Sequence, residues 1–150
     1  MRLHDVMTTE VKTIEAQASL AEAAMTMKLA NVGFLPVIGP TSKPIGVITD
    51  RDITIRSLAD GLSPNAQVRL AMSPAVHIVR EDDDLQAALD LMKDKKVGRV
   101  LIADKYGSLV GVLSLNDATI LCNGDTRTAQ VCRALRSRVS PSRWPEVLVM

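Results

Sequence analysis

The stretch Gly46-Val47-Ile48-Thr49-Asp50-Arg51-Asp52-Ile53 decides the fold, because the chain contains a second version of it 65 positions later. That second copy is Gly111-Val112-Leu113-Ser114-Leu115-Asn116-Asp117-Ala118. In both copies an apolar run leads to a hydroxyl residue, and an aspartate follows three positions later. The run predicts a short buried strand. The hydroxyl residue predicts the start of a helix, where its side chain accepts hydrogen bonds from free backbone N–H groups.

The same offset aligns the residues that precede the two turns, which identifies an internal repeat. Each repeat is too small to bury its own apolar face, so we expect the two to pack together about a pseudo-twofold axis. The matched pairs include Met7 with Met72, Val11 with Val76, Leu20 with Leu85, Ala23 with Ala88, Met27 with Met92, and Gly33 with Gly98.

Apolar periodicity predicts the order β-α-β-β-α in each repeat and therefore an α+β fold. We expect the first repeat over residues 3–61, a linker with a short helix over 62–74, and the second repeat over 75–122. A C-terminal helix and an irregular tail fill residues 123–150. The predicted strands are 11–14, 34–38, 45–48, 76–79, 100–103 and 109–113, and the predicted second helices of the two repeats are 50–59 and 114–122.

Capping residues set the ends of the first helix in each repeat. Ser19 and Glu22 form a capping box, Asp84 caps a helix over 85–95, and Gly33 is predicted to be the left-handed residue that closes the first helix. Gly107 supplies a positive φ angle in the hairpin turn at 104–107.

The C-terminal helix is predicted over residues 126–139. Ala129, Cys132, Leu135 and Val139 are expected on one side of it. Cys122 and Cys132 have no partner motif, and we expect two buried or half-buried thiols of a cytoplasmic protein.

Composition excludes several classes of function. Eighteen basic and 17 acidic residues leave a net charge of +1, so there is no electrostatic case for a nucleic acid or an anionic membrane. The aromatic residues are Phe34, Tyr106 and Trp144, too few for a stacking platform for nucleic acid. No apolar run approaches the roughly 20 residues of a membrane span, and the first residues lack the apolar core of a signal peptide.

The doubled turn, together with three shorter matches, resembles the cystathionine-β-synthase (CBS) domain family. Those matches are Val6-Met7-Thr8, Ala71-Met72-Ser73 and residues 33–37. The Thr49 to Asp52 turn is similar to that of small stand-alone bacterial CBS proteins. The resemblance implies two repeats packed sheet to sheet, with clefts that bind adenosine-containing ligands: AMP, ADP, ATP, S-adenosylmethionine or NAD.

By that resemblance Asp52 and Asp117 accept hydrogen bonds from ribose hydroxyls, and Thr49 and Ser114 lie near the ribose or phosphate. The chemistry agrees, since a carboxylate accepts from two hydroxyl groups at once. The alternative stays open: both aspartates only cap their helices, as the acidic members of variant capping boxes.

The resemblance also implies roles for residues around these turns. Arg99 stands at a position that binds phosphate, whereas its counterpart in the first repeat is Phe34, so the two clefts are expected to be chemically unequal. Arg51, with Asn116 as its counterpart, supplies charge to the first cleft. The adenine is bordered by the backbone at Thr13 and Ile78, with apolar walls from Leu35, Pro36, Val100 and Leu101.

We therefore expect a regulatory module that senses an adenosine nucleotide and acts on an unknown protein. The alternative is a dimerising interaction module with degenerate, ligand-free clefts. Neither a nucleophile with an adjacent base, nor a phosphate-binding glycine loop, nor a metal-ligand cluster occurs, so no enzyme, cofactor or metal site is predicted. A homodimer is expected through the apolar residues of the second helices: Ile53, Ile55, Leu58, Ala118, Ile120 and Leu121.

Overall fold

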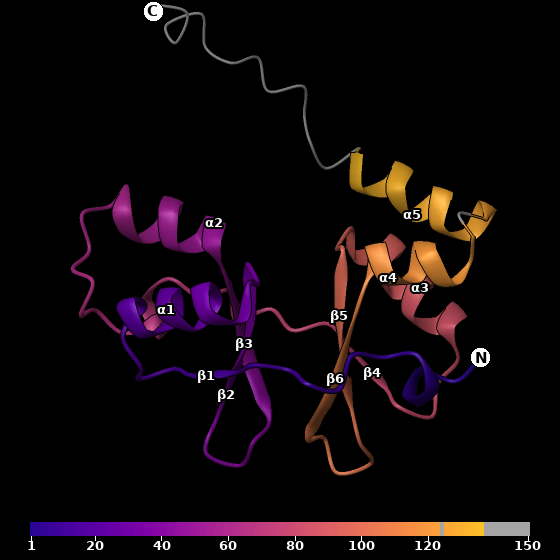
Figure 1. Cartoon of the computed structure of the whole chain (residues 1–150), viewed down its shortest axis with the longest axis horizontal. Coiled ribbons are helices and arrows are strands. Elements are labelled where there is room, and N and C mark those ends of the chain that lie inside the picture. The colour runs from indigo at the N-terminus through magenta and orange to yellow at the C-terminus, as the bar shows by residue number, and fades with distance from the viewer. Residues whose placement is uncertain (124, 137–150) are drawn as a thin grey trace, which may run out of the picture.

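A computed structural model of the chain describes residues 1–123 and 125–136, which form two three-stranded sheets with helices on their outer sides (Figure 1). In each sheet the first strand runs parallel to the second and the second antiparallel to the third. This is the α+β pair of repeats predicted from the sequence. The strands are β1 (Ile14–Glu15), β2 (Phe34–Ile38) and β3 (Pro44–Thr49) in one sheet, and β4 (Ile78–Arg80), β5 (Arg99–Ala103) and β6 (Leu109–Ser114) in the other.

The first helices of the repeats begin where their capping residues predict. α1 (Leu20–Ala30) starts after Ser19, whose side chain and that of Glu22 form the complete capping box, and α3 (Leu85–Lys95) starts after Asp84. The predicted closing residue is wrong. Asn31 and Lys96 take the left-handed conformation, with φ of 54° and 55°.

Glycine is required at position 33 because there is no space for a Cβ atom, and not because the helix ends there. A side chain at Gly33 would lie 2.7 Å from the Oδ2 atom of Asp50.

The second helices differ between the repeats. α2 (Asp50–Asp52) continues without a break into the wider turns of η2 (Ile53–Leu58), so the helix predicted over 50–59 is present but is not a regular α-helix after Asp52. α4 (Leu115–Leu121) is regular and follows Ser114, as predicted.

In each repeat, the segment before the first strand packs against the other repeat. The short helix η1 (Leu3–Asp5) contributes Leu3 to the core of the second sheet, and η3 (Val68–Leu70) contributes Val68 to the core of the first. Beyond them, Thr8 pairs with Val112 of β6 and Ser73 pairs with Val47 of β3, with two backbone hydrogen bonds of 2.8–3.0 Å at each pairing. These pairings cover the outer edges of β3 and β6, which would otherwise expose unpaired backbone groups.

Glycines make these crossings possible. A side chain at Gly111 would meet the sulfur of Met7 at 2.5 Å, and one at Gly46 would meet the carbonyl oxygen of Ser73 at 2.7 Å. Gly46 and Gly111, the repeated residues that open the two turns, are thus explained by the packing of Met7 and of the Met72–Ser73 segment.

α5 (Thr126–Arg136) packs on α3 and α4. Its most buried residues are Thr128 and Val131, and Leu135 packs against the same core, as the expected apolar side requires. Cys132 is exposed, so its expected burial is wrong. Cys122 is half-buried, as predicted. The predicted positions 137–139 and the tail 141–150 lie outside the described residues.

Candidate ligand-binding site

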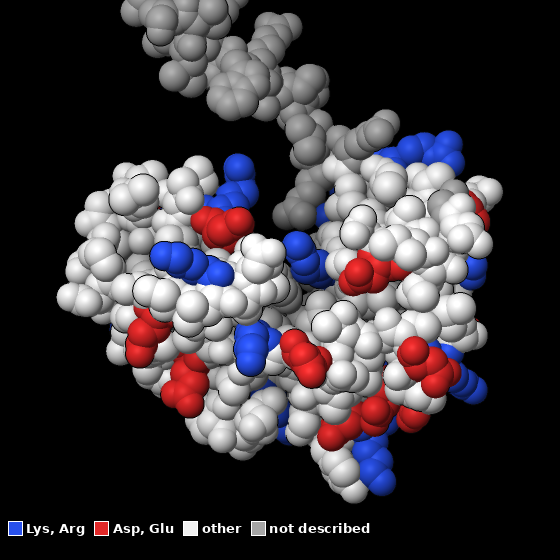
Figure 2. Space-filling view, viewed as in Figure 1, with Lys and Arg blue, Asp and Glu red and all other residues white. Residues whose placement is uncertain are grey.

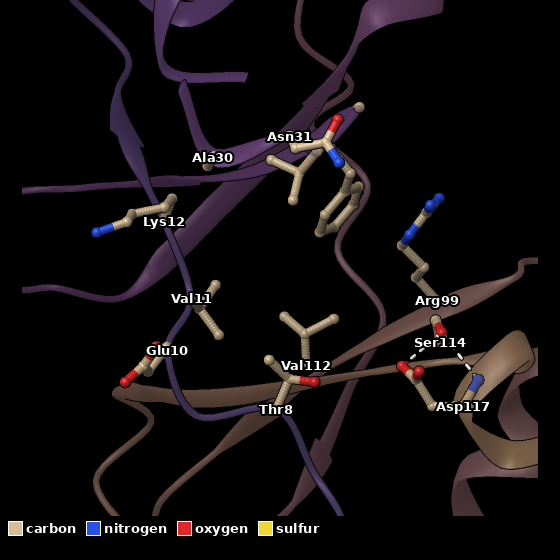
Figure 3. Close-up of a pocket in the computed structure, with 13 residues that line it drawn as sticks. Thr8, Glu10, Val11, Lys12, Ala30, Asn31, Arg99, Val112, Ser114 and Asp117 are labelled. Carbon is tan, nitrogen blue, oxygen red and sulfur yellow. Dashed lines mark hydrogen bonds between the residues drawn. The ribbon is translucent and has the colours of Figure 1, made fainter. Parts of the chain in front are cut away.

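A cavity of about 500 Å³ lies where the two repeats meet (Figure 3). Its wall combines the segment that crosses from β6 to β1, the end of α1 with the start of β2, and residues of β5, β6 and α4. The lining residues are Thr8, Glu10, Val11, Lys12, Ala30, Asn31, Val32, Gly33, Phe34, Arg99, Val112, Ser114 and Asp117.

One end of the cavity carries the hydroxyl and the carboxylate of the second repeated turn. The Ser114 hydroxyl donates to Oδ2 of Asp117 over 2.6 Å and accepts from the backbone N–H of Asp117 over 3.1 Å. The turn is fixed beside β5, because the N–H of Leu115 donates to the carbonyl of Gly98 over 2.8 Å. An ionised carboxylate has about four acceptor positions. Ser114 therefore caps the helix, and Asp117 keeps acceptor capacity on the cavity side.

Arg99 and Phe34 lie together at the cavity. The guanidinium carbon of Arg99 is 5.3 Å from the centre of the Phe34 ring, which is a cation–π contact. We expected these two residues in separate, unequal clefts, and that expectation is wrong for the described cavity, since both line it. The reason is geometric. They are the first residues of β2 and β5, which the pseudo-twofold relation of the repeats brings face to face between the sheets.

The middle of the cavity is apolar. In Figure 3 the side chains of Val11 and Val112 point into the space in front of Arg99, whereas Glu10 and Lys12 point away from it. Arg99 therefore supplies the positive charge on this side of the cavity, and Asp117 the negative charge.

The first repeated turn is built differently. The Asp52 carboxylate accepts from the N–H of Thr49 over 2.9 Å, and the Thr49 hydroxyl accepts from the N–H of Asp52 over 3.1 Å. The second carboxylate oxygen lies 3.8 Å from Nε of Arg56. The residue that corresponds to Arg56 in the second repeat is Leu121. Both oxygens of Asp52 thus have protein partners, and neither Thr49 nor Asp52 lines the described cavity.

The model of the CBS domain family matches residues 3–58 and 66–124. The chain belongs to the CBS domain family. It is 31% identical over 114 residues to hypoxic response protein 1 of Mycobacterium tuberculosis, covering 75% of this chain and 79% of that protein. An uncharacterised protein of Methanopyrus kandleri is 32% identical over 109 residues, covering 72% of this chain but 56% of that longer relative.

Solved CBS structures show the same fold. The crystal structure of hypoxic response protein I with two coordinated zinc ions is 30% identical, with a TM-score of 0.71, over 80% of this chain and 98% of the other. The CBS domain protein PAE2072 of Pyrobaculum aerophilum, complexed with AMP, is 23% identical, with a TM-score of 0.72, over 83% and 98% of the two chains.

The CBS pair brings together three of the predicted site residues, namely Arg99, Ser114 and Asp117. The other predicted residues do not line the described cavity. Leu35 and Val100 are fully buried in the two cores under the helices. Successive residues of a strand face opposite sides of a sheet, so Leu35 and Pro36 cannot both face one cleft, and the same holds for Val100 and Leu101.

The remaining predicted contacts fall outside the described cavity, and their roles stay predictions. Arg51 and Asn116 are exposed, Thr13 is half-buried, and Ile78 is 39% exposed. Pro36 and Leu101 are buried on the opposite strand faces from Leu35 and Val100.

The sequence pattern did not predict the lining contributed by residues 8–12 and 30–33. The crossing segment carries no periodic signal of its own, and its place in the cavity depends on the exchange of leading segments between the repeats. Asn31 offered a local signal, because asparagine tolerates the left-handed conformation that ends α1. Among the described residues, no three His, Cys, Asp or Glu side chains gather as they would around a metal ion. Nor is any helix of residues 1–123 and 125–136 sufficiently long and apolar for a membrane span.

Proposed function

We propose that this CBS pair is a regulatory module that binds an adenosine-containing ligand in the cavity between its repeats. The observation that carries the proposal is the composition of that cavity. A carboxylate and its neighbouring hydroxyl lie on one side of the cavity together with an arginine from the adjacent strand β5, and the apolar side chains of Val11 and Val112 lie beside them (Figure 3). The CBS protein PAE2072, which has the same fold, is complexed with AMP, a ligand of the class proposed here.

Each part of a nucleotide has a chemical match in this arrangement. The ribose has two adjacent hydroxyl groups, and the acceptor capacity left on Asp117 suits them. A phosphate takes paired N–H donors from the planar guanidinium of Arg99. The flat, weakly polar adenine suits the apolar surface of Val11 and Val112.

Regulation follows from where the cavity lies. Its wall is shared between the repeats, so a ligand that contacts Val11 and Asp117 touches residues from both. Such a ligand stabilises the arrangement that it binds, and any partner protein that prefers that arrangement responds to ligand concentration. The face seen in Figure 2 has basic and acidic side chains interspersed, with no field of one sign to favour a nucleic acid.

Thermal unfolding tests the proposal. The full chain would be heated with and without millimolar AMP, ADP, ATP, NAD or S-adenosylmethionine. A ligand at ~100 times its dissociation constant adds about 2.7 kcal/mol to the free energy of unfolding. The Asp117→Asn variant should respond less than the wild type. Asp94→Asn, an exposed change outside the cavity, should respond like the wild type. If no compound raises the melting temperature, the ligand-free interaction module becomes the better account.

We also propose that the module is a homodimer through its outer helices. Ile55, Leu58, Ile120 and Leu121 are 50%, 74%, 68% and 36% exposed, so apolar surface remains uncovered on both repeats. Ala118 is fully buried, and Ile53 packs against the core, so these two leave the expected interface. Light scattering at micromolar concentration should give twice the monomer mass, and Leu58→Asp should lower it. A wild-type monomer would contradict the dimer.

A further inference from the structure

We propose that Phe34 is a positioning residue for Arg99, and that the cavity therefore prefers a phosphorylated adenosine ligand over an uncharged or cationic one. This inference rests on the function proposed above. It extends that function by naming the ligand class and by assigning a role to a residue that does not itself contact the phosphate.

The side chain of Arg99 contacts an aromatic ring and forms no salt bridge with the described residues. Among residues 1–123 and 125–136, its interaction partner is the Phe34 ring at 5.3 Å, and no carboxylate lies within the 4.0 Å of a salt bridge. Asp117, which also lines the cavity, is hydrogen-bonded to Ser114. Within the described part of the chain, Arg99 thus brings its positive charge to the cavity without a paired anion. A phosphate would supply that anion, whereas the cationic sulfonium of S-adenosylmethionine would be repelled.

Phe34 contacts Arg99 from the other repeat. It is half-buried at the start of β2 and pairs with Thr49 of β3, so its ring belongs to the framework of the first repeat. Arg99 belongs to the second repeat and pairs with Ser114 of β6. The ring holds the guanidinium from across the junction, without using the N–H donors that a phosphate needs. A long arginine side chain otherwise loses rotamer freedom when it binds, and a contact made beforehand reduces that cost.

The repeat relation adds a consequence for stoichiometry. Residues 34 and 99 are the same position in the two repeats, and the chain has one arginine there and one phenylalanine. The two repeats together therefore supply one arginine at this position, and that arginine can bind one phosphate group. We expect one phosphate-dependent site per chain.

The experiment is calorimetric titration of the full chain with AMP and with adenosine. The informative quantity is the ratio of the two dissociation constants, because a general packing defect weakens both ligands together. The wild type should bind AMP more tightly than adenosine, at about one AMP per chain. Arg99→Gln should weaken AMP about ten- to hundredfold and adenosine little. Phe34→Leu should lower the AMP preference about two- to fivefold, the range of an exposed cation–π contact.

Two further variants sharpen the result. Phe34→Tyr keeps an aromatic face and should restore the AMP preference. Arg80→Gln removes the same charge from an exposed position outside the cavity and should leave the preference unchanged. An AMP preference that Phe34→Leu does not alter would overturn the positioning role. Equal binding of AMP and adenosine by the wild type would overturn the ligand class while leaving the proposed function intact. Failure of every adenosine compound to bind would overturn both.

Discussion

The two repeated turns share their sequence pattern and the hydrogen bond from the aspartate N–H to the capping hydroxyl, but the first is a complete capping box and the second is not. Around Thr49 and Asp52, the carboxylate receives a backbone N–H on one oxygen and lies 3.8 Å from Arg56 on the other. Around Ser114 and Asp117, the carboxylate receives the serine hydroxyl and faces the cavity.

One substitution accounts for much of this difference. Position i+4 from the aspartate is arginine in the first repeat and leucine in the second, so the second carboxylate has no ion-pair partner on its own helix. A duplicated motif is therefore not a duplicated site. Capping is common to both turns, and ligand binding is proposed for one.

The largest expected effect separates the two aspartates. Asp117→Asn replaces a double acceptor by one acceptor and one donor group, and should weaken the best adenosine ligand by roughly 1.5–3 kcal/mol, about ten- to hundredfold. Asp52→Asn should change binding less than twofold. Calorimetric titration of both variants measures this, with thermal unfolding of the free proteins as the folding control. Equal losses at both positions would erase the distinction between the turns.

The two glycines that open the turns should also differ. Gly46→Ala sets a new Cβ 2.7 Å from a backbone oxygen, whereas at Gly111 the obstacle is the flexible side chain of Met7. Gly46→Ala should therefore lower the free energy of unfolding by about 1–3 kcal/mol, and Gly111→Ala by less. Urea denaturation measures both. A larger loss at Gly111 would show that Met7 cannot move aside.

α5 gives the second repeat a cover that the first repeat lacks among the described residues. Val131 is 1% exposed in the core of that repeat, so Val131→Ala removes two buried carbon groups and should cost about 1.6 kcal/mol. Cys132→Ala, at the exposed neighbouring position, should cost almost nothing. Thermal unfolding of the pair checks whether α5 packs in solution. Identical melting of Val131→Ala and the wild type would mean that it does not.

The smallest effect concerns the arginine that distinguishes the first turn. Arg56 is 52% exposed and Asp52 is 16% exposed, so Arg56→Gln should lower the free energy of unfolding by only about 0.3–0.5 kcal/mol. Raising the salt concentration should shrink that difference. A salt-independent loss would point instead to the hydrogen bond from Arg56 to the Met72 carbonyl.

The sequence was sufficient for the fold because its signals are local and repeated. Ser19, Asp84 and Ser114 cap the helices they were expected to cap, and the offset of 65 predicts two like units. The predicted end of α1 was wrong because glycine is the usual left-handed residue after a helix, which favoured Gly33. Asn31 adopts that left-handed conformation instead. Local propensity could not separate two residues that are both compatible with a left-handed conformation.

The site was less predictable because it depends on contacts between distant segments. Arg99, Ser114 and Asp117 were identified, but the lining from Thr8 and Val11 requires that the leading segment cross to the other repeat. The contact between Arg99 and Phe34 likewise depends on how the two sheets face each other. The offset relates these residues in sequence and says nothing about their separation in space.

The exchanged leading segments also affect how the protein folds during its synthesis. The backbone N–H of Leu3 donates to the carbonyl of Asp83, and Thr8 pairs with Val112. The residues that are synthesised first therefore pair with residues that are synthesised much later. At 5–20 residues per second, roughly 5–20 s separate the synthesis of Thr8 from that of Val112. The Ser73 segment that covers β3 is made 39 residues before Val112, so the edge of β3 is uncovered during the earlier part of this interval only. The nascent first repeat is thus a natural target for chaperones, and slowing translation between the repeats should lengthen its exposure.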